Sequence, residues 1–259
     1  MKIRQNASIY LFYTVAAVLI FSLSASQWFT TSPSKDDNKK YVYKINPVAQ
    51  PITINADWNK KIWNDTESVR LINYMGDKPT PFPEVQVKVR YDDKNIYVIF
   101  KVNDRYVRAV AKENNGKVWE DSCVEFFFAP GPDIERGYFN VETNCKGIIL
   151  MNFSKKGSDK RGSISSEDIS KITIAHSLSK NTETEIMEPV TWTLEYKIPF
   201  SMLAKYIKVE KPGKGINWRA NFYKCGDETS HPHWLTWAPI INPTPNFHLP
   251  EYFGWLEFQ

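Results

Sequence analysis

The sequence is poor in cysteine and lacks the motifs that mark many catalytic sites. Its three cysteines, Cys123, Cys145 and Cys225, form no CxxC pair. The sequence contains no GxSxG, no HExxH, no glycine-rich phosphate loop, no EF-hand loop and no Cys/His cluster at zinc-finger spacing. These absences argue against an enzyme. For the thiols two alternatives stay open: a Cys145–Cys225 disulfide with one free thiol, or three buried free thiols.

Dense blocks of one charge are also absent. The net charge of +4 is spread along the chain, so no nucleic-acid partner is expected. A glycosidase would need two carboxylates facing each other across a cleft, and no such pair is evident from the order of residues. The sequence therefore predicts a protein that binds its ligand without catalysis.

Long apolar runs are absent except near the N-terminus. Residues 9–23 carry no charge and follow Lys2 and Arg4. A run of about 15 residues is long enough for the core of a signal peptide and short for a bilayer of ~30 Å. Because residues 24–26 are small, residues 1–26 are predicted to be a signal peptide that is cut after Ser26. The alternative is an uncleaved membrane anchor, which would be the only contact with a membrane that the sequence predicts. Either way the protein is expected to be exported, to the periplasm, the cell surface or the medium.

The composition changes after this run. Residues 27–40 form a predicted disordered linker, because 30–40 are polar and charged and cannot bury themselves. Residues 41–259 are predicted to form one domain. Within it, the polar, Ser-rich segment 155–170 is expected to be an exposed loop or a mobile insertion.

Segments with helical periodicity are rare, whereas short alternating segments are common. In residues 85–91 four apolar side chains alternate with three polar ones, the pattern of a half-buried strand. A turn at 92–95 and a second strand at 96–102 complete a predicted hairpin. Further strands are expected at 124–128, 138–143, 147–153, 192–198, 218–225, 234–237 and 253–258, with a helical turn at 200–206. This pattern predicts an all-β fold, an antiparallel, jelly-roll-like β-sandwich.

The segment WEDSCVEFFF, residues 119–128, contains the most informative residues. Trp119 ends a polar segment just before a strand, so its indole is either folded under a loop or exposed to bind a ligand. Glu125 lies between Val124 and Phe126, and the period of two turns it to the opposite face, together with Phe127. A carboxylate there faces either solvent or a concave sheet surface.

Four segments together resemble the family 9 carbohydrate-binding modules, in particular stand-alone exported proteins of that type. They are Asp57-Trp58 with Trp63, YDDKNIYVIFKVND at 91–104, WEDSCVEFFFAP at 119–130, and FGWLEF at 253–258. The resemblance spans nearly all of residues 50–259. It implies a β-sandwich in which two tryptophans clamp the terminal sugar ring of a glycan, so a carbohydrate is the expected partner.

The resemblance also implies site residues. Trp119 matches the first clamp, and Glu125, six residues later, matches the family's key glutamate. For the second clamp Trp237 fits best, with Trp234 as the rival. We therefore expect Trp119 and Trp237 to face each other across a groove, with the Glu125 carboxylate at its floor. Polar donors are expected from the hairpin after residue 128 and from the late strands, and the nearest candidates are Asn144, Lys146 and Asn221.

The sequence is also compatible with other ligands and functions. Structural calcium is common in the family, but its ligands cannot be placed; no other cofactor is expected. His231, His233 and His248 are either ordinary loop histidines or a metal site. The same fold could serve as an envelope structural or interaction protein with no working sugar site, or, with a facing Met and His, could hold haem. The remaining tryptophans are expected to pack in the core: Trp58, Trp63, Trp192, Trp218 and Trp255.

Overall fold

The computed structural model describes residues 41–155 and 162–259. The predicted leader and linker, residues 1–40, lie outside the described residues, as does the segment 156–161. Within the described part, no helix is both long enough and apolar enough to cross a membrane.

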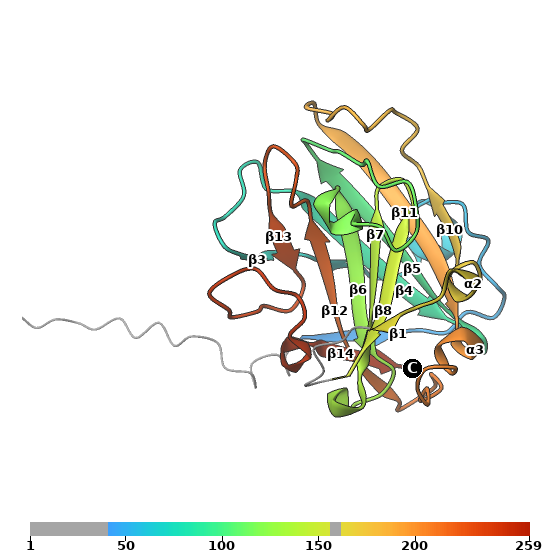
Figure 1. Ribbon diagram of the computed structural model, residues 1–259. Coiled ribbons are helices and arrows are strands. Elements are labelled where there is room, and N and C mark those ends of the chain that lie inside the picture. Colours follow the sequence, from blue (N-terminus) through green and yellow to red (C-terminus); the bar gives the residue numbers. More distant parts are fainter. Residues whose placement is uncertain (1–40, 156–161) are drawn as a thin grey trace, which may run out of the picture. The chain divides into compact units, whose positions relative to one another are not determined.

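The described chain forms two packed β-sheets, which confirms the predicted sandwich. One sheet has nine strands in the order β1-β14-β12-β6-β7-β8-β9, with β13 paired to β12 and β3 to β13. Its strands are β1 Val42–Ile45, β3 Asn73–Met75, β6 Cys123–Ala129, β7 Tyr138–Asn144, β8 Ile149–Ser154, β9 Gly162–Ser163, β12 Asn217–Cys225, β13 Trp234–Thr236 and β14 Gly254–Phe258. Neighbours are antiparallel except β1 and β14, which are parallel. Figure 1 shows β6, β7, β8 and β12 layered over the second sheet.

The second sheet has five strands in the order β10-β11-β5-β4-β2. They are β2 Val69–Arg70, β4 Glu84–Tyr91, β5 Asn95–Asp104, β10 Thr173–His176 and β11 Val190–Pro199. The predicted hairpin is the β4–β5 pair, with Val89 opposite Val98. The predicted helical turn after Pro199 is α3, Phe200–Leu203; the other short helices are α1 Lys61–Asn64, α2 Ser166–Ile169, and the 3-10 turns η2 Val118–Glu120, η3 Ile134–Arg136 and η4 Pro250–Tyr252.

The main core lies between the two sheets and is built by alternation along the strands. On β6, Val124, Phe126 and Phe128 are buried in it, together with Phe222 of β12 and Phe100 of β5. Because successive side chains point to opposite faces, the other residues of β6 must lie on the outer face of the nine-stranded sheet. Cys123 and Phe127 do so, in a second buried cluster that also contains Tyr223 and Cys225.

A third cluster covers the outer face of the five-stranded sheet. There Trp63 and Ile52, from the segment before β2, pack on Tyr97 and Ile99. Glu195 of β11 anchors this segment, because its buried carboxylate accepts hydrogen bonds from Trp63 Nε1 at 2.8 Å, Lys60 Nζ at 2.5 Å and two backbone N–H groups. The core prediction is confirmed for Trp63, Trp192 and Trp218, which are fully buried, whereas Trp58 and Trp255 are half-buried.

Two sequence predictions are wrong here. Residues 162–170 are not a loose part of an exposed insertion. They contain β9 and α2, bury Ile164 and Ile169, and are anchored by Asp168, which accepts hydrogen bonds from Lys205 Nζ at 2.5 Å and Tyr206 Oη at 2.7 Å. Of the two alternatives for the cysteines, the Cys145–Cys225 disulfide is wrong and the three buried free thiols are confirmed. All three cysteines are buried free thiols, and Cys145 lies in the core between the sheets while Cys225 lies on the outer face.

Candidate functional site

A pocket of about 310 Å³ lies on the outer face of the nine-stranded sheet. Strands β6, β7, β8 and β12 supply its base, and η2, β13 and the segments after β12 and β13 supply the rest of its lining. Its lining residues are Trp119, Glu125, Phe127, Glu142, Leu150, Asn152, Cys225, Asp227, Trp234, Pro245, Asn246, Phe247 and His248.

Two half-buried tryptophans line this pocket, and Asp227 links them. The backbone N–H of Asp227 donates to the Trp119 carbonyl at 3.1 Å. Its side-chain Oδ1 accepts a hydrogen bond from Trp234 Nε1 at 2.8 Å. The second link fixes the orientation of the Trp234 indole, whereas the first fixes the backbone from which Trp119 extends. Asp227 therefore links both tryptophans, through its carboxylate to the Trp234 indole and through its backbone N–H to the Trp119 carbonyl.

Glu125 lies in the base of the pocket, as the alternation along β6 predicted. It is 2% exposed, and it receives a hydrogen bond from the Cys225 thiol, with 3.1 Å between Sγ and Oε1. Burial raises the pKa of this carboxyl well above its usual value, and the nearby Cys225 and Glu142 raise it further. Burial thus shifts this group toward its protonated form, and a protonated carboxyl group can both donate and accept a hydrogen bond.

Further polar groups surround Glu125. Glu142 of β7 is its direct cross-strand partner and accepts a hydrogen bond from Asn140 Nδ2 at 2.8 Å. Asn152 of β8 lies one strand further along the same face. On the side of the pocket His248 shares a hydrogen bond of 3.0 Å with Tyr138 Oη. Burial raises the pKa of Asp227, partly offset by its bond to Trp234.

The expected clamp of Trp119 and Trp237 is wrong. Trp237 is 6% exposed and belongs to the core between the sheets, where its ring packs edge-on against Tyr41 and tilted against Phe222, with centroids 6.1 and 5.6 Å apart. Trp234 lines the pocket instead. The two tryptophans are three positions apart along an extended segment, and an odd separation places them on opposite faces of the sheet.

The three predicted polar donors do not line the pocket either. Asn144 is buried at the end of β7, where its Nδ2 donates to Asp121 Oδ2 at 3.0 Å and its Oδ1 accepts from the Lys146 and Ile148 backbone in the turn that follows. Lys146 lines a different hollow and donates to the Leu178 carbonyl at 3.0 Å. Asn221 bridges β12 to Ala238 through two hydrogen bonds of 2.9 Å. Each of these three side chains is already hydrogen-bonded to backbone groups of neighbouring segments.

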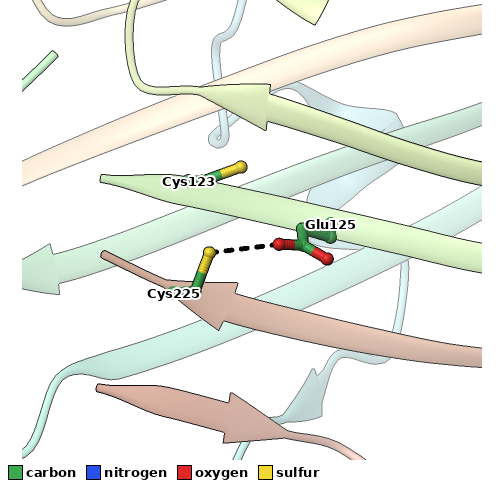
Figure 2. Close-up of side chains that lie close together, drawn as sticks. All are labelled: Cys123, Glu125 and Cys225. Carbon is green, nitrogen blue, oxygen red and sulfur yellow. Dashed lines mark hydrogen bonds between the residues drawn. The ribbon is translucent and has the colours of Figure 1, made fainter. Parts of the chain in front are cut away.

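The three histidines do not form a metal site. His233 is buried and bonded to Lys224 Nζ at 2.6 Å, His231 stacks on Tyr106 at 3.6 Å between centroids, and His248 lines the pocket. Over residues 41–155 and 162–259, the one close group of three metal-ligating side chains is Cys123, Glu125 and Cys225 (Figure 2). The calcium ligands stay unassigned.

Sequence reasoning missed several pocket residues, and for some a signal existed. Along β7, Asn140, Glu142 and Asn144 are spaced by two residues, so a polar row on one face could have been inferred. That this row lies beside Glu125 depends on the register that pairs Glu125 with Glu142. Asp227, Asn246 and His248 lie on segments between strands, where residue order gives no spacing rule, and could not have been placed.

Comparisons with known proteins agree with this architecture. The family model for carbohydrate-binding family 9 matches residues 55–258. The structure is similar to a crystal structure of a candidate carbohydrate-binding protein from Bacteroides uniformis ATCC 8492, with 31% identity and a TM-score of 0.76 over 84% of this chain and 99% of that one. It shares its fold with a family 9 module from Caldicellulosiruptor kristjanssonii solved with glucose, at 15% identity and a TM-score of 0.53, covering 84% of this chain and 96% of the module.

The fold is also similar to that of a family 9 module from Caldicellulosiruptor kristjanssonii solved with cellotriose, at 16% identity and a TM-score of 0.51, covering 83% of this chain and 93% of that module. A comparison with curated proteins gave no significant match. The family match covers most of the chain, in agreement with the resemblance found in the sequence. The chain belongs to carbohydrate-binding family 9.

Proposed function

We propose that this protein binds a carbohydrate, the terminal sugar ring of a glycan, in the pocket lined by Trp119 and Trp234. The observation that carries the proposal is the arrangement of two indoles, that of Trp234 held by Asp227, beside a base of polar groups at Glu125, Glu142 and Asn152. An envelope protein without a working sugar site is not favoured, because a family member that had lost binding would have no need to keep both indoles at one pocket.

The pocket suits the chemistry of a pyranose. One face of the ring presents C–H groups, which pack on an indole, while hydroxyls project from its rim. A protonated Glu125 can donate to one sugar oxygen and accept from a hydroxyl, and Asn152 offers both a donor and an acceptor. The pocket volume of about 310 Å³ is at the small end of ligand sites, which suits one ring better than a long chain.

The proposal includes the absence of catalysis. Glu125 and Glu142 are cross-strand partners and project from the same sheet face. A glycosidase instead places its two carboxyl groups on opposite sides of the bond it cleaves. Because Glu125 and Glu142 lie side by side beneath the proposed sugar ring, they are suited to hydrogen bonding with its hydroxyl groups. Incubating the protein with aryl glycosides tests this: turnover that Glu142→Gln abolishes would contradict the proposal.

Glucose is the first ligand to test, because related modules of low identity were solved with glucose and cellotriose. Isothermal titration of the full chain with each sugar should give one site per chain. Trp119→Ala should reduce affinity by about 2–4 kcal/mol, as expected for an aromatic anchor. Trp255→Ala is the matched control, since Trp255 is half-buried outside the pocket against Arg219. Equal losses in both variants would argue against the site.

We also propose that the protein acts outside the cytoplasm. The support is the basic start, the apolar residues 9–23 and the small residues 24–26 of the sequence. N-terminal sequencing of the material found in the periplasm, at the cell surface or in the medium should then give Gln27 as the first residue. An intact Met1 on that material would favour the uncleaved anchor.

A further inference from the structure

Two cysteines and a glutamate meet on the outer face of the nine-stranded sheet. Cys123 and Glu125 are two residues apart on β6, so both side chains project from the same face. Cys225 of β12 is the direct cross-strand partner of Cys123. Opposite residues on neighbouring strands have Cβ atoms about 4.5–5.5 Å apart, close enough for both thiols to reach one atom.

The side chains are close together and shielded from water. The two sulfurs and one carboxylate oxygen all lie within 4.8 Å of one another. Cys225 Sγ lies 3.1 Å from Glu125 Oε1, and Figure 2 shows this sulfur directed at the carboxyl group across the gap between the strands. Cys123, Glu125 and Cys225 are exposed by 0%, 2% and 1%. Two thiols and one carboxyl group, each able to lose a proton, therefore lie together in a buried space.

We propose that Cys123, Glu125 and Cys225 bind one thiophilic divalent cation of the zinc type. Bonds of about 2.3 Å to sulfur and 2.0–2.2 Å to oxygen place two sulfurs and one oxygen roughly 3.5–3.8 Å apart around a tetrahedral ion. The two sulfurs and the carboxylate oxygen lie within 4.8 Å of one another, so side-chain shifts of about 1 Å would bring them to this arrangement. The ion replaces both thiol protons and any proton on the carboxyl group. Calcium and magnesium do not fit, because they select oxygen ligands over thiolates.

The sugar pocket gives the ion access from solvent. Glu125 and Cys225 both line it, whereas Cys123 lies deeper. Three protein ligands leave a fourth position for water, as in zinc sites that keep an open position. That position is reachable from the pocket, so a sugar hydroxyl could take it. The metal site does not depend on the proposed sugar binding, since its ligands converge whether or not a sugar enters.

Titration of the reduced, metal-free full chain with Co²⁺ tests the site, because thiolate coordination gives a charge-transfer band and tetrahedral Co²⁺ gives strong visible absorption. One equivalent per chain is expected, and Zn²⁺ should displace it. Cys123→Ser and Cys225→Ser should each weaken binding by about a hundredfold, about 2.8 kcal/mol at tenfold per 1.4 kcal/mol. Glu125→Gln, of nearly the same shape, should weaken it without loss of the fold.

Cys145→Ser is the matched control, because Cys145 is also a buried free thiol but lies on the other face of the sheet. It should leave the titration unchanged. The proposal is overturned if the folded protein shows no charge-transfer band, or if Cys145→Ser weakens Co²⁺ as much as Cys225→Ser. It is also overturned if the thiols isolate as a Cys123–Cys225 disulfide and bind no metal once reduced. Sugar titration without metal separates this outcome from failure of the proposed function.

Discussion

Alanine at Trp237 and at Trp234 should have opposite consequences, although the two residues are three positions apart. Trp237 is 6% exposed, and its ring packs on Tyr41, Tyr43 and Phe222. It also fills the space beside Gly254, where a Cβ atom would lie 2.9 Å from its ring. Removing so large a buried side chain leaves a cavity that the sheets cannot close.

The magnitude follows from this packing. Truncating a buried aromatic to alanine costs about 3–5 kcal/mol of the free energy of unfolding. For a domain of this size, at about 2–4 °C per kcal/mol, the thermal midpoint should fall by roughly 10 °C. Trp234 is half-buried, and its indole Nε1 donates a hydrogen bond to Asp227 Oδ1. Its replacement should cost about 1 kcal/mol of stability and most of the sugar affinity.

Urea denaturation and sugar titration of both variants, at one temperature where each is folded, provide the comparison. Folded Trp237→Ala should keep affinity within about threefold, because the residue does not line the pocket. The reasoning is refuted if Trp237→Ala keeps its stability but loses sugar binding, or if Trp234→Ala loses stability as much as Trp237→Ala does.

Two further predictions concern stability alone. Glu195→Gln should lower the free energy of unfolding by about 3 kcal/mol, because one amide group would face buried donors that a carboxylate now satisfies. Glu183 is an exposed ion-pair partner of Lys112, so Glu183→Gln should leave the free energy of unfolding nearly unchanged, and equal effects of the two variants would argue against an anchoring role for Glu195. Burial, with Lys224 nearby, lowers the pKa of His233 from 6.5 to about 4. Between these two pH values the unfolded state binds more protons than the folded state, so the free energy of unfolding should fall as the pH drops from 6.5 to about 4, by up to about 3 kcal/mol. In urea titrations at several pH values, His233→Gln should remove this part of the slope, and an unchanged slope would show that other groups are responsible.

The fold was predictable because alternation encodes the two sheet faces directly. The hairpin β4–β5 and the outward turn of Glu125 both followed from the period of two, and the structure has both. The same rule, applied to the late strands, would have separated Trp234 from Trp237. The family resemblance favours Trp237 by its position relative to the last strand, but that position does not determine the sheet face on which the indole lies.

The rest of the pocket depends on information that residue order does not carry. Glu142 lies beside Glu125 because of the β6–β7 register, and Asn144 is excluded because Asp121 and the following turn occupy its polar atoms. Composition also misleads for residues 162–170, which are polar yet folded. Asp168 there accepts hydrogen bonds from Lys205 and Tyr206, partners that only the tertiary structure brings near it.

The indole N–H resonances of the protein offer the most direct test of the central claim. Nine tryptophans give separate signals in a ¹H–¹⁵N spectrum, assignable by single substitutions. Titration with glucose or a cello-oligosaccharide should shift the signals of Trp119 and Trp234, which line the pocket, and leave those of Trp63, Trp192, Trp218 and Trp237 in place. A saturable shift confined to the buried tryptophans, or to Trp58 and Trp255 outside the pocket, would contradict the account.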